Sequence, residues 1–212
     1  MSSPKSVAVI TFSTRTPRVG PEIAAIVKEI LDKDAEASGI QLTPVDLADF
    51  NLPVYDEPVV PAMVPANASF IHQHSIAWSA EIKKHDGYVL VIPEYNFGMA
   101  GGTKNAIDYL KHEWVGKPAA IVSYGIEGGK TASEQLNHTL TMLTLRVAAT
   151  RPALRFFGDH GPEMQSAVFQ GKAGPESRKE WAEKDSVDIL KAFAELKELL
   201  TQEPPPPEKQ KV

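Results

Sequence analysis

The sequence predicts an α/β protein built on a parallel sheet with helices on both faces. Short apolar runs that indicate strands alternate with helical periodicity along the whole chain, which is the pattern of such a sheet. Two of these runs, at 88–92 and 119–122, show no polar alternation, as expected for central strands covered on both faces. The chain of 212 residues has 42% hydrophobic and 23% charged residues, which is typical of a single globular domain.

Five strands and about five helices can be assigned from this pattern. The expected strands are 7–10, 41–47, 88–92, 119–122 and 152–157, and the expected helices are 21–37, 66–85, 103–113, 131–146 and 176–200. Gly39 and Gly87 follow two of these helices, as helix stops do. Five strands suit a flavodoxin-like three-layer sandwich better than an eight-stranded barrel, which needs about 250 residues.

The chain is expected to form one domain over residues 1–203, followed by a disordered tail at 204–212 that is rich in proline and lysine. The proline-rich segment 51–65 should be a loop. Its apolar side chains are expected to be exposed, namely Val59, Val60, Met63 and Val64. Because an exposed apolar patch usually marks an interface, this segment predicts a homodimer. On the following helix, His72 and His74 should point away from each other.

Composition and charge exclude several classes of function. Without cysteine, the chain has no disulfide, Cys-ligated zinc, iron–sulfur cluster or thiol nucleophile. A formal net charge of −5 argues against nucleic-acid binding over the whole surface. No apolar run is long enough to cross a membrane, and the first residues do not form a signal peptide. We therefore expect a soluble, cytoplasmic protein, and no residue spacing indicates a metal site.

Three loops follow strand ends, where open parallel sheets bind their ligands. The first, 11–20, carries two arginines and several hydroxyls before a helix N-terminus, which suits an anion such as a phosphate. The second, 93–102, combines aromatic residues, an amide and three glycines, and glycine lets a flat ligand approach the backbone. The third, 123–130, offers glycine amides for the other side of such a ring. Without a ligand, the same loops would be a helix cap with solvated arginines and two flexible turns.

Two motifs carry a resemblance to a known family. Pro93-Glu94-Tyr95-Asn96 is followed by Lys104-Asn105-Ala106-Ile107-Asp108-Tyr109. With this block and its spacing, the chain resembles the NADPH-dependent FMN reductases, in the fungal branch of the flavodoxin-like flavin and quinone reductases. The resemblance covers about residues 6–200. The chain departs from the family pattern at Phe12, Ala100 and Thr103, where glycine, proline and leucine are common.

The resemblance implies non-covalent FMN as the cofactor and NADPH or NADH as the co-substrate. The phosphate of FMN would be held by Ser13, Arg15, Arg18 and the amide of Val19. The isoalloxazine ring would be edged by Pro93, Glu94, Tyr95, Asn96 and Phe97, and its pyrimidine side would be closed by Ser123, Tyr124, Gly125, Gly128 and Gly129. Family members are usually homodimers or homotetramers. No residue is assigned as catalytic, because the flavin carries the reactive atom.

Two functions from different classes remain open at this point. The first is an oxidoreductase that passes a hydride from NAD(P)H through bound FMN to a small-molecule electron acceptor, which is a quinone, free flavin or azo compound, in two alternating (ping-pong) half-reactions. The second is a flavin-binding interaction protein or electron carrier whose reductase turnover is incidental. A carrier of the flavodoxin kind would be more acidic and would need no nicotinamide pocket, which favours the oxidoreductase.

Overall fold

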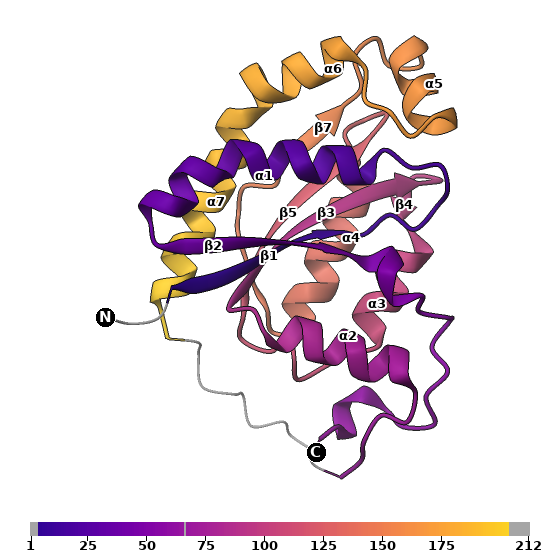
Figure 1. The fold of residues 1–212 in the computed structure, drawn as a ribbon, viewed down its shortest axis with the longest axis vertical. Coiled ribbons are helices and arrows are strands. Elements are labelled where there is room, and N and C mark those ends of the chain that lie inside the picture. Colours follow the sequence, from indigo (N-terminus) through magenta and orange to yellow (C-terminus); the bar gives the residue numbers. More distant parts are fainter. Residues whose placement is uncertain (1–3, 66, 204–212) are drawn as a thin grey trace.

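The computed structural model describes residues 4–65 and 67–203 and consists of a sheet between two layers of helices (Figure 1). The long strands are β1 (Lys5–Thr11), β2 (Ile40–Asp46), β3 (Gly87–Tyr95) and β5 (Pro118–Gly125), and the short strands are β4 (Gly98–Met99), β6 (Arg146–Val147) and β7 (Ala153–Arg155). The α-helices are α1 (Gly20–Ala37), α2 (Gln73–Lys83), α3 (Gly101–Asp108), α4 (Lys130–Met142), α5 (Pro162–Phe169), α6 (Pro175–Glu180) and α7 (Ser186–Thr201). A π-helical turn at Trp181–Asp185 joins α6 to α7. The tail predicted at 204–212 lies outside the described residues.

The strand order confirms the predicted flavodoxin-like sandwich. The strands β2, β1, β3 and β5 pair in parallel in that order. The fifth position is shared by β6 and β7, which pair with opposite ends of β5, so the strand expected at 152–157 is shorter than predicted. The order of strands reverses at β1, and ligands bind at the carboxyl ends of the strands beside such a reversal.

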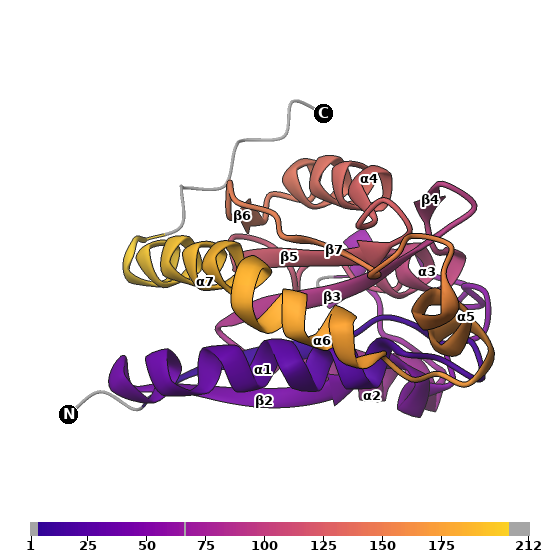
Figure 2. The same cartoon turned by 90° about the horizontal axis from the view of Figure 1, so that it is seen from above.

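Alternate residues of the central strands pack against the two helix layers, which lie on opposite sides of the sheet in Figure 1, whereas Figure 2 views the sheet from the side of α1 and α6. Val7 and Val9 of β1 belong to the cluster with α1 and α7, whereas Ala8 and Ile10 belong to the cluster with α2, α3 and α4. Phe12 continues the second pattern and is wholly buried. Its departure from the family's glycine therefore adds an aromatic side chain to the core, and burial of such a ring stabilises by about 1.5–3 kcal/mol.

The helix predicted from Ala66 to His85 is wrong at its start, because α2 begins only at Gln73. The buried carboxylate of Glu57 accepts hydrogen bonds from the backbone N–H groups of Ile71, at 3.0 Å, and His72, at 2.9 Å. These bonds fix an extended entry to the helix. His72 lies before the helix, and its ring stacks on that of His74 with centroids 5.2 Å apart. The prediction that these two side chains point apart was therefore also wrong.

Segment 51–65 is mostly a loop, as predicted, with one 3-10 turn at Pro61–Met63. Val60 and Met63 are exposed, as expected, and Val59 is half-buried. Val64 is only 6% exposed, so its predicted exposure was wrong. Two further apolar side chains near this part of the sequence, Val54 and Ile71, are also exposed.

Candidate functional site

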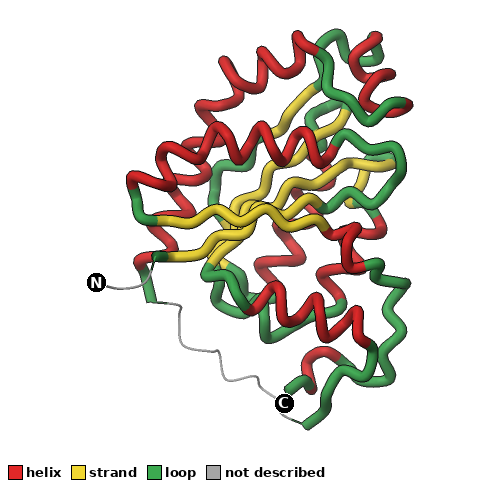
Figure 3. The backbone as a smooth tube through the Cα atoms, viewed as in Figure 1, coloured by secondary structure: helices red, strands yellow, loops and turns green. Residues whose placement is uncertain are grey.

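The carboxyl ends of β1, β3 and β5 meet at one edge of the sheet, where loops collect (Figure 3). A cavity of about 320 Å³ opens there, which is within the usual size range of small-ligand pockets. The predicted site residues that line it are Arg15, Arg18, Val19, Glu94, Tyr95, Asn96, Tyr124 and Gly125. The remaining predicted residues lie behind this lining or outside the cavity, namely Ser13, Pro93, Phe97, Ser123, Gly128 and Gly129. All three loops therefore contribute to one site.

The first loop is fixed by its second arginine. The guanidinium of Arg18 donates to both carboxylate oxygens of Asp46, at 2.7 and 3.0 Å, and to the carbonyl of Ser13, at 2.9 Å. This bidentate pair anchors the loop to the end of β2. Arg15 is exposed and donates to the carbonyl of Val168 at 2.8 Å. The two arginines thus differ, since Arg18 shapes the loop while Arg15 reaches across the cavity mouth.

The start of α1 has the features of an anion-binding position. Val19 is the N-cap of α1 and lines the cavity, and no described side chain caps this end, so backbone N–H groups and the positive end of the helix dipole are left at the cavity. A Cβ atom on Gly20 would lie 2.0 Å from Ser13 Oγ and 2.8 Å from Tyr124 Oη, so only glycine fits between them. Burial raises the pKa of Tyr124, which keeps its phenol protonated.

Ser13 Oγ is buried, and among the described residues it makes no hydrogen bond of normal geometry, although the phenol of Tyr124 lies close enough to interact with it. Leaving a buried hydroxyl without a partner costs about 1–3 kcal/mol. A phosphate oxygen held by the N-terminus of α1 would supply the missing partner. The hydroxyl, the nearby Arg15 and the uncapped helix end therefore fit a bound phosphate group.

The segment 93–102, predicted as a loop, contains a tight hairpin that leads into α3. β3 continues through Tyr95, and β4 turns back so that Glu94 pairs with Met99 and Tyr95 pairs with Gly98. The turn residues Asn96 and Phe97 have φ values of 49° and 59°, which is the geometry of a type I′ turn. The strand pairing was not predicted, because the sequence analysis took the three glycines as the flexible positions of this segment. The turn instead begins at Asn96, a residue that tolerates a positive φ. Phe97 is 77% exposed at its tip.

Side-chain hydrogen bonds fasten this hairpin to α4, the helix that follows the third loop. Glu94 Oε2 accepts from the N–H of Ala132, in the first turn of α4, at 3.1 Å, where a carboxylate also offsets the positive end of the helix. Gln135 Oε1 accepts from the N–H of Met99 at 2.7 Å. Glu94 therefore positions two walls of the cavity relative to each other.

The glycine turn owes its shape to close backbone packing. Gly128 and Gly129 have φ values of 76° and 72°, and a Cβ on Gly128 would lie 2.6 Å from the carbonyl oxygen of Ala153. Ser123 Oγ donates to the Gly128 carbonyl at 2.8 Å. These residues shape the wall from behind, and Gly125 presents its backbone to the cavity.

The motif at 104–109 lies in and directly after α3 and holds the proline-rich segment. Asn105 Nδ2 donates to the carbonyl of Pro53 at 2.7 Å, and its Oδ1 accepts from the N–H of Tyr55 at 3.0 Å. Tyr109 Oη donates to Asp56 at 3.0 Å. Burial alone would raise the pKa of Asp56, but hydrogen bonds from His74 and Tyr109 hold it below its usual value.

One wall of the cavity was missed by the sequence analysis. Phe156, after β7, lines it together with Met164, Ala167 and Val168 of α5. The hydrogen bond between Arg15 and Val168 ties this helix to the first loop. Proline is over-represented at the first position of helices, so Pro162 followed by apolar residues was a signal for α5 that could have been used.

The fold and the site together define a flavodoxin-like protein with a cavity suited to a phosphate-bearing flat ligand. The chain belongs to the NADPH-dependent FMN reductase family, whose pattern matches residues 6–157. It is 50% identical over 198 residues to an NAD(P)H-dependent FMN reductase of Nectria sp, a match that covers 92% of this chain and 97% of that protein. It is 28% identical over 183 residues to a quinone reductase of Escherichia coli, covering 84% and 85% of the two chains. The crystal structure of an oxidoreductase from Corynebacterium diphtheriae shares the fold, with a TM-score of 0.63 at 18% identity and coverage of 94% and 98%.

These matches confirm the family expected from the sequence, and with it an FMN-dependent NAD(P)H oxidoreductase. Across residues 4–65 and 67–203, no helix combines the length and the apolar composition needed to cross a membrane. The contacts of individual residues with FMN stay predictions.

Proposed function

We propose that the cavity holds FMN with its phosphate in loop 11–20 and its ring between the hairpin and the glycine turn, and that the enzyme reduces quinones, free flavin or azo compounds. One observation supports this most strongly: the loops after β1, β3 and β5 line a single cavity. The first loop contributes arginine side chains and the uncapped N-terminus of α1, and the other two loops contribute the backbone of their turns.

In this proposal, Ser13, Arg15, Arg18 and the amide of Val19 bind the phosphate, with Arg18 also holding the loop through Asp46. The ring is edged by Pro93, Glu94, Tyr95, Asn96 and Phe97, and its pyrimidine side is closed by Ser123, Tyr124, Gly125, Gly128 and Gly129. Glu94 and Ser123 act by positioning, because their side chains bond to the backbone of neighbouring segments.

When bound, FMN accepts a hydride from NAD(P)H and passes it to the acceptor. The residues of this chain orient the ring and exclude water from one of its faces. Donor and acceptor share the other face in turn, which predicts ping-pong kinetics. Parallel double-reciprocal lines with NADPH and a quinone varied together are expected, and intersecting lines would contradict a shared face. Asn96→Ala should slow flavin reduction more than it shifts the pH profile, because no titrating group acts at this position.

The phosphate assignment is tested by titrating the apo protein with FMN. Arg15→Ala and Arg18→Ala should each weaken binding by roughly ten- to a hundred-fold, as expected for loss of a charge-assisted hydrogen bond. Asp46→Asn is the matched control, because it breaks the anchor of Arg18 and keeps the arginine. Retained affinity in that variant would indicate direct contact of Arg18 with phosphate, and a loss equal to that of Arg18→Ala would indicate loop positioning. Unchanged affinity in both arginine variants would remove the assignment.

Mixing the yellow protein with NADPH under nitrogen separates the enzyme from an electron carrier. Rapid bleaching of the flavin band, followed by rapid reoxidation by a quinone, is expected. Sluggish bleaching would favour the flavin-binding protein or electron carrier.

We also propose that the protein forms a homodimer through segment 51–65, which includes the exposed Val54, and through the exposed Ile71 that follows it in the chain. The support is the apolar surface formed with Val60 and Met63, held rigidly by Asn105 and Tyr109. Light scattering at micromolar concentration should give the mass of two chains. A tetramer would require a further surface, and a monomer would contradict the proposal.

A cytoplasmic location is proposed from the co-substrate, because NAD(P)H is produced inside cells. Fluorescence microscopy of the tagged chain should show diffuse signal in the cytoplasm. Enrichment in a membrane-bound compartment would contradict this location.

A further inference from the structure

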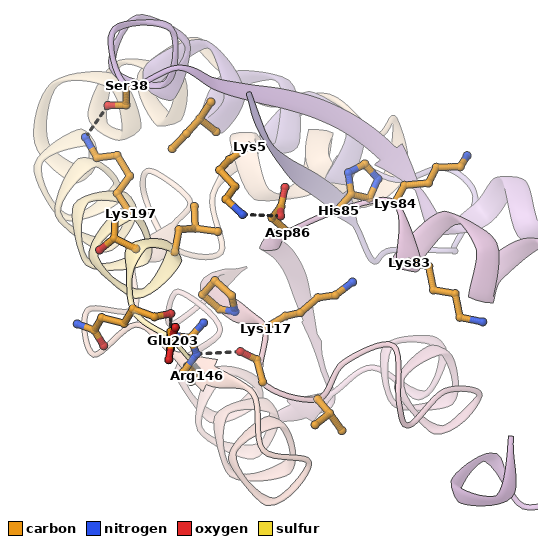
Figure 4. Close-up of a pocket in the computed structure, with 17 residues that line it drawn as sticks. Lys5, Ser38, Lys83, Lys84, His85, Asp86, Lys117, Arg146, Lys197 and Glu203 are labelled. Carbon is orange, nitrogen blue, oxygen red and sulfur yellow. Dashed lines mark hydrogen bonds and ion pairs between the residues drawn. The ribbon is translucent and has the colours of Figure 1, made fainter. Parts of the chain in front are cut away.

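A cavity of about 910 Å³ opens at the amino edge of the sheet, opposite the candidate site (Figure 4). The cations of its lining already have protein partners. Lys5 pairs with Asp86, Lys83 with Glu113, Lys84 with Glu81 and Lys197 with Asp34, while Lys117 and Arg146 donate to the carbonyls of Ile82 and Leu199. Helix C-termini gather at this edge, and cations there offset the negative ends of the helix dipoles. These cations therefore have a structural role.

A smaller cavity has cations without such partners. It measures about 310 Å³ and lies between the start of α4 and the segment before β7, with a lining of Lys130, Ser133, Glu134, Ala149, Arg151 and Ala153. Among the described residues, neither Lys130 nor Arg151 forms an ion pair or a side-chain hydrogen bond. Every other arginine of the chain donates to a carbonyl or carboxylate oxygen. Arg151 is half-buried, so its guanidinium lacks a partner where part of the solvent is excluded.

The hydroxyl of Ser133 is a second group without a partner in the same cavity. The residue is only 4% exposed, and its Oγ makes no hydrogen bond within residues 4–65 and 67–203. A serine inside a helix commonly bonds to the carbonyl four residues earlier, but Ser133 Oγ makes no such bond to Gly129. A buried hydroxyl is unfavourable in this state. An oxygen of a bound anion would supply its partner.

Two carboxylates affect the charge around this cavity. Glu134 is part of the lining, but it is exposed to solvent. Glu94 accepts a hydrogen bond from the N–H of Ala132 in the first turn of α4, so the N-terminus of this helix already has an anionic partner. The side chains of Lys130, Ser133 and Arg151 therefore define the site, and its cations outnumber its carboxylates two to one.

We propose that this cavity binds a dianionic phosphate group, which pairs with Arg151 and Lys130 and accepts a hydrogen bond from Ser133. A guanidinium binds phosphate through two parallel N–H···O bonds, and an ammonium adds a point charge. The hydroxyl of a serine is one donor, which an anionic oxygen satisfies.

Two sources present the same phosphate chemistry to this cavity. The glycine turn contacts both cavities of the carboxyl edge, because Gly125 lines the candidate site and a Cβ on Gly128 would lie 2.6 Å from the carbonyl oxygen of Ala153. One source is therefore the 2′-phosphate of NADPH, an assignment that rests on the proposed function. The other source is free inorganic phosphate.

The main test is a calorimetric titration of the full-length protein with inorganic phosphate, after saturation with FMN. Arg151→Gln should weaken phosphate binding roughly ten- to a hundred-fold, as expected for loss of a charge-assisted hydrogen bond. Arg155→Gln is the matched control, because Arg155 is exposed, pairs with Asp159 and lines neither cavity. Equal affinity in the two variants, or no phosphate binding by wild type, would overturn the proposal.

Ser133→Ala gives a test that a purely structural serine would fail. In chloride buffer, this variant should be at least as stable as wild type, because the lost hydroxyl has no partner. In phosphate at equal ionic strength, the melting temperature of wild type should rise more than that of the variant, because the hydroxyl then contributes to binding. An equal rise in the two proteins would contradict the role of Ser133.

Steady-state kinetics with the two co-substrates distinguish the sources of the phosphate group. With NADPH as the source, Arg151→Gln should raise the KM for NADPH about ten-fold or more and leave the KM for NADH unchanged. Unchanged KM values for both, with phosphate binding lost only in the variant, would identify free phosphate as the source. The titration needs no turnover, and both arginine variants keep loop 11–20. Failure of the proposed function would therefore leave the comparison of phosphate binding intact.

Discussion

The two edges of the sheet are built from the same strands, yet they offer opposite chemistry. At the carboxyl edge, the loops after β1, β3 and β5 lead into the N-termini of α1, α3 and α4, whose unpaired N–H groups attract anions. At the amino edge, α2 and α7 end, and Lys117 and Arg146 donate to their last carbonyls. The direction of the helix dipoles therefore places an anion site built mainly from backbone at one edge and a group of lysines at the other.

The largest expected difference between the two edges is the loss of stability when a glycine at each edge is replaced by alanine. Gly128 at the carboxyl edge and Gly39 at the amino edge have φ values of 76° and 65°. A Cβ on Gly128 would lie 2.6 Å from the Ala153 carbonyl oxygen, whereas a Cβ on Gly39 would meet nothing within 4 Å. Gly128→Ala should lower the free energy of unfolding by about 2–4 kcal/mol, and Gly39→Ala by about 1 kcal/mol, the cost of the backbone conformation alone.

Urea unfolding of both variants, followed by circular dichroism, measures this difference. Gly128→Ala should also weaken FMN binding, because the glycine turn would shift. Equal destabilisation would show that backbone strain, and not close packing, sets the cost at both edges.

A smaller effect is expected at the amino edge as pH changes. The pKa of Lys117 is lowered to about 8 by burial, so between about pH 8 and its ordinary value near 10.4 the unfolded chain binds more protons than the folded one. Stability linked to this group therefore rises with pH across that window. Wild type should gain on the order of 1–2 kcal/mol relative to Lys117→Met between pH 8 and 10. Unfolding curves at both pH values measure it, and parallel pH profiles would contradict the lowered pKa.

The sequence was sufficient for the fold and for the three loops that line the candidate cavity. Buried strands and strand-end loops are local patterns, so Arg15, Asn96 and Tyr124 could be placed at one edge before any contact was known. Glu57 could not be predicted to delay the start of α2, because its bonds to Ile71 and His72 join segments that no short-range pattern connects. The lysines of the amino edge come from segments that are far apart in the sequence, so the order of the strands had to be known before they could be grouped with Lys117. In the same way, the place of the short helix α5 in the cavity wall depends on tertiary contacts that the sequence does not show.

The smallest effect concerns strain at the carboxyl edge. At the amino edge, the positive φ after α1 is adopted by a glycine, Gly39. At the carboxyl edge, the hairpin has a phenylalanine, Phe97, at a φ of 59°. A bulky residue in this conformation is unfavourable, and Asn-Gly is the preferred pair for a type I′ turn. Because the Phe97 side chain is 77% exposed, Phe97→Gly should lose little packing and raise the free energy of unfolding by about 0.5–1 kcal/mol, with Phe97→Asn gaining less.

Thermal melts and turnover of the Phe97 variants, measured together, show whether this strain has a use. Strain of this kind is kept where a site needs it, and the exposed ring lies beside the cavity residues Tyr95 and Asn96. We therefore expect Phe97→Gly to be more stable and to have a higher KM for an aromatic quinone. A gain in stability without any change in KM would show that the Phe97 ring has no part in turnover. The strain at Phe97 would then have no functional use.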